Sequence, residues 1–86
     1  MPIIICDISS FEYEMPIYVI DNDKMLKTYH SDIEHLPESI AVIAYQNGVS
    51  DIKLRGPLSY LEPWIEDIKT FYSLNYGNNN INIEVI

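Results

Sequence analysis

Hydrophobic residues in the first part of the chain follow the pattern of strands. Residues 2–8 form an almost continuous apolar, β-branched run, and a strand without alternation is usually covered on both faces and central in its sheet. Residues 15–20 and 25–29 follow as two further strands, joined by a turn at 21–24 whose Asp and Asn residues favour tight bends. The charges and mixed polarity of the 25–29 strand are typical of a sheet edge. The pattern therefore predicts a central strand followed by a hairpin.

The hydrophobic period then changes to that of a helix. Ser31 and Glu34 have the capping-box spacing, in which two side chains satisfy backbone amides at a helix start. Asn47 and Gly48 are typical of a helix end. Between these positions apolar residues recur at helical spacing, namely Ile33, Leu36, Ile40 and Ile43. A helix is therefore predicted before the next strand, in which residues 51–55 alternate.

A second and longer helical pattern separates the last two strands. Ser59 and Glu62 repeat the capping-box spacing, and an amphipathic run continues to about Tyr76. Residues 81–86 alternate as the final strand. A helix that connects two strands of one sheet normally makes them parallel neighbours with a right-handed connection. We therefore expect a single α/β domain over residues 1–86 with two crossover helices.

The predicted order of elements, β-β-β-α-β-α-β, resembles the core of the ribonuclease H-like fold. The resemblance rests on topology, covers nearly the whole chain, and implies a mixed five-stranded sheet in the order 3-2-1-4-5. In ribonuclease H-like nucleases the central first strand carries a metal-binding Asp, and Asp7 ends such a strand here. Those enzymes also carry a Glu early in the first helix, to which Glu34 or Glu38 corresponds. The resemblance thus implies a candidate nuclease site.

The acidic set that such a nuclease needs is incomplete. The third carboxylate belongs at the end of the fourth strand, where residues 55–57 read Arg-Gly-Pro. Asp51 is at the opposite end of that strand, about 12–14 Å away, and the segment that carries the last acidic ligand would follow Ile86. Because two-metal phosphoryl transfer needs several carboxylates around ions about 3.5–4 Å apart, we expect a scaffold with no catalytic residues, metal or cofactor. A reduced metal-dependent nuclease that uses Asp7 with one of the two glutamates is the alternative.

The chain carries a large excess of acid. There are 13 Asp and Glu residues against 5 Lys and Arg, which gives a net charge of −8. Nucleic-acid backbones are bound by clustered basic residues, so no direct nucleic-acid binding is expected. The negative charge favours solubility, and it would also complement the surface of a basic protein partner. A second alternative is therefore an acidic inhibitor of a nucleic-acid-binding protein.

Cysteine content and hydropathy indicate the compartment. Cys6 is the single cysteine and lies in the apolar first strand, so a buried, inert thiol in a reducing environment is expected. No run approaches the ~18 apolar residues of a membrane span. The many Ile, Asn and Tyr residues suit an AT-rich genome, such as that of a low-GC bacterium or its phage. We expect a cytoplasmic protein of a bacterium or of a phage-infected cell, without membrane association.

A small polar cluster lies at the entrance to the first helix. His30, Asp32 and His35 are close together in the sequence, and His and carboxylate groups can ligate zinc. The chain has only two histidines and no cysteine nearby. A polar helix entrance is therefore the preferred interpretation.

The long helix and the last strand are the best candidates for an interface. Tyr60, Trp64 and Tyr72 lie on an aromatic stripe that is wider than one small sheet face needs, and aromatic residues are favoured at interface centres. Ile83 and Ile86 belong to a final strand whose open edge can pair with another chain. The sequence thus predicts a small, acidic, non-enzymatic accessory protein that forms a homo-oligomer or binds a protein partner.

Overall fold

Strands and helices follow one another in the predicted order. The computed structural model describes residues 1–10 and 12–86. The elements are the strands β1 (Ile3–Asp7), β2 (Glu14–Asp21) and β3 (Lys24–Asp32), the 3-10 turn η1 (Ile33–His35), the helix α1 (Leu36–Gln46), the strand β4 (Asp51–Arg55), the helix α2 (Leu58–Tyr76) and the strand β5 (Asn82–Val85). Within the described residues, neither helix combines the length and the hydrophobicity needed to cross a membrane.

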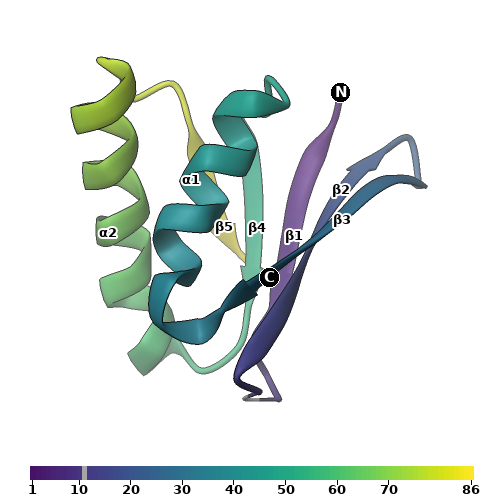
Figure 1. The fold of residues 1–86 in the computed structure, drawn as a ribbon, viewed down its shortest axis with the longest axis vertical. Helices are drawn as coiled ribbons and strands as arrows, with labels where there is room; N and C mark the ends of the chain where they lie inside the picture. The colour runs from purple at the N-terminus through teal and green to yellow at the C-terminus, as the bar shows by residue number, and fades with distance from the viewer. Residues whose placement is uncertain (11) are drawn as a thin grey trace.

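The five strands form one mixed sheet in the order β3-β2-β1-β4-β5 (Figure 1). β1 pairs antiparallel with β2 and parallel with β4, and β5 pairs parallel with β4. The opening strand is therefore central, and β3 lies at an edge. Both predictions are confirmed, as is the predicted sheet order 3-2-1-4-5.

Both helices cover the same face of the sheet (Figure 1). The connections β3-α1-β4 and β4-α2-β5 step in the same direction across the sheet, and two right-handed crossovers of that kind place their helices on one side. On this side six sheet residues are at most 1% exposed, namely Ile4, Cys6, Ile17, Val19, Ile52 and Leu54. The core therefore lies between the sheet and the two helices.

The opposite face of the sheet, which we call the uncovered face, has no helix over it in the described part of the chain. Ile3 and Ile5 alternate with the buried Ile4 and Cys6, point to this face, and are only partly buried. The prediction that the first strand is covered on both faces is therefore wrong. The apolar run places similar residues on both faces of β1. Because both crossovers step in the same direction, however, their helices cover only one face.

The helix starts differ from the predicted capping boxes. β3 runs on through Asp32, so Ser31 lies in a strand, and its hydroxyl lies 2.7 Å from the hydroxyl of Ser39. Asp32 is the N-cap of η1 instead, and its carboxylate accepts a hydrogen bond from the His35 amide at 2.9 Å. α2 begins before Ser59, at a position with no side-chain cap. Both capping-box predictions are therefore wrong.

Candidate interaction surfaces

Asp7 ends β1 and is engaged by the turn that follows it. Its Oδ1 accepts a hydrogen bond from the Ser9 amide at 2.8 Å, and Arg55 is its neighbour in register on β4. The hydrogen bonds from Ser9, followed by the charge of Arg55, hold the pKa of Asp7 below its ordinary value. This carboxylate therefore remains ionised and stabilises the end of the central strand.

The two candidate partners of Asp7 lie in the helical layer. Glu34 belongs to η1 and Glu38 to the first turn of α1, and both line a hollow between α1 and α2 that Asp67 also lines. Asp7 lines a separate hollow beside the β1–β2 connection. Among residues 1–10 and 12–86, no three His, Cys, Asp or Glu side chains come close enough together to hold a metal ion. The residues do not fit the two-metal site of a ribonuclease H-like nuclease.

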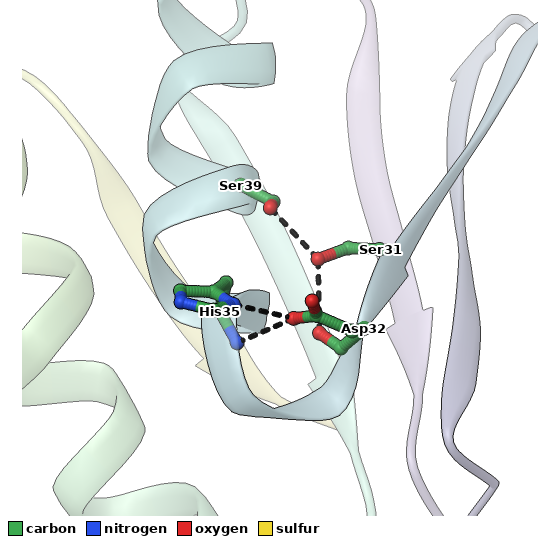
Figure 2. A network of polar contacts seen from close by, with 4 residues as sticks. All are labelled: Ser31, Asp32, His35 and Ser39. Atoms are coloured by element: carbon green, nitrogen blue, oxygen red, sulfur yellow. Dashed lines mark hydrogen bonds and ion pairs between the residues drawn. The ribbon is translucent and has the colours of Figure 1, made fainter.

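A polar network joins the end of β3 to the start of α1 (Figure 2). Oδ1 of Asp32 lies 2.8 Å from Nδ1 of His35, in addition to its bond with the His35 amide. The Ser31 hydroxyl donates to the Asp32 carbonyl at 3.0 Å and also meets Ser39. The side-chain hydrogen bond raises the pKa of His35 and lowers the pKa of Asp32. The network stabilises the strand-to-helix junction, in agreement with the predicted polar helix entrance.

Cys6 is fully buried on the helix-covered face of the sheet. Burial raises the pKa of its thiol to about 12, and its Sγ approaches the carbonyl oxygen of Pro16 at 3.5 Å. The thiolate is the reactive form of cysteine. The thiol is therefore protonated at neutral pH and inert, as predicted.

Tyr72 lies in the core and not on a surface. Its side chain is 7% exposed, and its ring meets those of Tyr45 and Tyr76 edge to face, at centroid distances of 6.3 Å and 5.1 Å. Tyr45 and Tyr76 themselves stack 3.8 Å apart. The predicted interface is therefore wrong at Tyr72, because a tyrosine from α1 packs against it. The spacing of aromatic residues along α2 could not predict this contact, because Tyr45 belongs to α1.

Two of the other predicted interface residues, Tyr60 and Ile86, lie at the same end of the molecule. Tyr60 and Ile86 are 51% and 54% exposed, whereas Trp64 and Ile83 are partly buried against the core. α2 connects two parallel strands, so its first turns lie at the same end as the last residues of β5. The Ile86 amide continues the ladder to β4 by donating to the Leu54 carbonyl at 2.9 Å. The outer edge of β5 has no strand partner in the described chain, and its role as an interface stays a prediction.

The uncovered face carries an apolar centre that the sequence analysis does not predict. Five partly buried apolar side chains point there from the two middle strands, namely Ile3, Ile5, Pro16, Tyr18 and Ile20. On β4, Lys53 lies beside this centre and forms an ion pair with Glu84 of β5 at 2.7 Å. Buried and partly buried positions alternate strictly along residues 15–20, so successive β2 side chains point to the covered and the uncovered face in turn. This apolar centre has a charged border, as interaction surfaces often do.

Comparisons with known proteins identify the fold. No protein-family model matches the sequence, and no curated protein gives a significant match. The chain is similar to a solved protein from Bacteroides thetaiotaomicron VPI-5482, described as having an actin-like ATPase fold and unknown function, with a TM-score of 0.70 and 13% sequence identity. The match covers 99% of this chain and 32% of the Bacteroides chain, so this chain spans about a third of that length. The actin-like ATPase fold is a ribonuclease H-like fold, and the predicted fold class is thereby confirmed.

Proposed function

We propose that this chain is a small, non-enzymatic interaction protein that self-associates through the uncovered face. The observation that carries the proposal is the difference between the two faces of the sheet. Six sheet residues under the helices are at most 1% exposed, whereas five apolar side chains on the other face remain partly exposed. Contiguous exposed apolar patches with polar borders mark interaction sites in soluble proteins.

The size of the uncovered face suits a stable contact. Strands of four to nine residues, about 4.8 Å apart and with a rise of about 3.3 Å per residue, give a flat area on the order of 500 Å² before side-chain relief is added. A standard protein interface buries about 800 Å² on each partner. Pairing two uncovered faces therefore supplies a large part of such an interface, and the side chains at its border supply the remainder.

The distribution of charge favours the uncovered face over the helical layer as the contact between two copies. The uncovered face presents two basic and four acidic side chains, namely Lys53, Arg55, Asp7, Glu14, Asp51 and Glu84, so both signs are present. The helical segments carry a net negative charge, with five acidic residues and one lysine, namely Glu34, Glu38, Glu62, Glu66, Asp67 and Lys69. Like charges brought together across an interface are unfavourable. Two helical layers therefore repel each other more strongly than two uncovered faces do, because the uncovered faces offer more basic groups to pair with acids.

Light scattering coupled to size-exclusion chromatography tests this proposal over a wide concentration range. The wild-type protein is expected to show a mass that rises above 10.0 kDa with concentration. Tyr18→Lys places a charge in the apolar centre and is expected to return the mass to that of one chain. Ser59→Lys adds the same charge at an exposed position of α2 and is expected to behave as wild type. A wild-type mass of one chain at every concentration contradicts the proposal.

A further inference from the structure

A groove runs across the helical layer. A hollow of about 330 Å³ lies between α1 and α2, and a second hollow of about 380 Å³ lies where α1 meets β3. Glu38 and Phe71 line both hollows. The two hollows are therefore neighbouring parts of one groove, separate from the uncovered face.

The groove combines apolar side chains with carboxylates. Its apolar lining includes Val42, Phe71 and Leu74, and Leu74 is 80% exposed on the well-formed helix α2. Three carboxylates border it, namely Glu34, Glu38 and Asp67. Among the described residues, no Lys or Arg lines either hollow. Two histidines, His30 and His35, line the second hollow, and His35 already bonds Asp32. A basic segment with adjacent apolar residues is the complementary ligand.

The tip of the β2–β3 hairpin has that composition. Residues 24–27 read Lys-Met-Leu-Lys, and the Met25 and Leu26 side chains are 57% and 55% exposed. In the described part of the chain neither lysine forms an ion pair. Figure 1 shows this tip extending away from both helices, where a second molecule can reach it.

The tip is formed by a tight turn between two paired strands. Asn22 and Asp23 have φ angles of 50° and 63°, which is the positive-φ pair of the tight hairpin turn that matches strand twist. Asp21 and Lys24 are still paired across the ladder on either side of this turn. A preorganised tip loses little conformational entropy when it docks.

We propose that the hairpin tip of one copy, residues 24–27, docks into the groove of a second copy. Met25 and Leu26 then cover Phe71 and Leu74, while the two lysines meet the three carboxylates. The contact joins two different surfaces, so it is heterologous and adds copies head to tail. Met25 lies opposite Ile20 at one corner of the uncovered face, but the contact uses none of the five side chains of the apolar centre. It provides contacts for basic and apolar groups that are otherwise exposed to solvent.

Charge reversal tests the contact, with dissociation constants measured by sedimentation equilibrium in a Tyr18→Lys background that removes pairing of the uncovered faces. The hairpin variant carries Lys24→Glu and Lys27→Glu, and the groove variant carries Glu38→Lys and Asp67→Lys. The matched control carries Glu62→Lys and Glu66→Lys, which reverse two exposed acids of α2 outside the groove. Far-UV circular dichroism checks that each variant is folded.

The background protein is expected to associate at low salt and to dissociate as salt rises, because exposed charge pairs are screened. Each reversed variant alone is expected to raise the dissociation constant about tenfold or more. An equimolar mixture of the two is expected to restore association, since each tip then meets a groove of opposite charge. The control is expected to change the constant by less than about twofold.

Three results would overturn the head-to-tail contact: a background protein that is monomeric at low salt, a mixture of reversed variants that stays monomeric, or a control that weakens association as much as the groove variant. A separate comparison of wild type with Tyr18→Lys at high salt, where the hairpin contact is screened, reports on the uncovered face alone. The two contacts are therefore tested independently.

Discussion

Tyr72→Ala is expected to lower the free energy of unfolding by about 3–5 kcal/mol, the usual cost of removing a large buried aromatic ring. The Tyr72 side chain is 7% exposed, and its ring packs edge to face against Tyr45 and Tyr76, which adds to the burial energy. Urea unfolding checks this, through a lower midpoint at unchanged slope.

Leu74→Ala is the matched control for Tyr72→Ala. Leu74 lies on the same helix only two positions further along, but it is 80% exposed, and surface substitutions usually change stability by no more than about 0.5 kcal/mol. If Leu74→Ala costs as much as Tyr72→Ala, or if Tyr72→Ala leaves stability unchanged, then the placement of the tyrosine ring in the core is wrong.

Gly56→Ala is expected to lower the free energy of unfolding by about 2–5 kcal/mol, from backbone strain and overpacking together. Gly56 has a φ of 148°, and an added Cβ would lie 2.5 Å from Cγ1 of Ile8 and 3.3 Å from its carbonyl carbon. Ile8 has little freedom to move, because it is 1% exposed and its amide donates to the Arg55 carbonyl at 2.8 Å. The measurement is again the midpoint of urea unfolding.

Gly48→Ala separates the two causes of that loss. Gly48 also has a positive φ, 64°, but a Cβ there would meet nothing within 4 Å. Only the left-handed backbone conformation is penalised, by about 1–2 kcal/mol. The close approach of Gly56 to Ile8 predicts that Gly56→Ala is the more damaging of the two. Equal losses would mean that this contact does not contribute.

The order of the sheet was predictable because it depends on features that the sequence displays directly. A hairpin follows the continuous apolar run at residues 2–8, and the two later strands are each preceded by an amphipathic helix. Short turns make strands neighbours, and right-handed crossovers restrict where parallel strands can lie. These rules place β1 in the centre and β3 at the edge, as the structure has them.

The coverage of each face was harder to predict, because the residue types of β1 are alike on both faces. Ile3 and Ile5 look the same in sequence as Ile4, although only Ile4 is buried under a helix. The missing information is the direction in which both crossovers step across the sheet. Hydrophobic period alone therefore predicted a strand covered on both faces, and the uncovered face was not foreseen.

The candidate sites depend on contacts between elements that are distant in the sequence. Tyr72 is buried because Tyr45 of α1 packs against it, and spacing within α2 does not reveal that contact. The Ser31 hydroxyl lies beside Ser39 because β3 continues past the predicted helix start. Asp7 and Glu38 line separate hollows. Side chains brought together by tertiary packing were the part that local patterns did not predict.

Incubation with labelled DNA, RNA and RNA–DNA hybrid in Mg²⁺ or Mn²⁺ tests most directly whether this chain acts by binding a protein and not by catalysis. Asp7 lines a different hollow from Glu34 and Glu38, and no three metal-ligating side chains gather among the described residues. All three substrates are therefore expected to remain intact with the wild-type protein and with Asp7→Asn alike. Cleavage by the wild-type protein that Asp7→Asn abolishes would contradict the proposal.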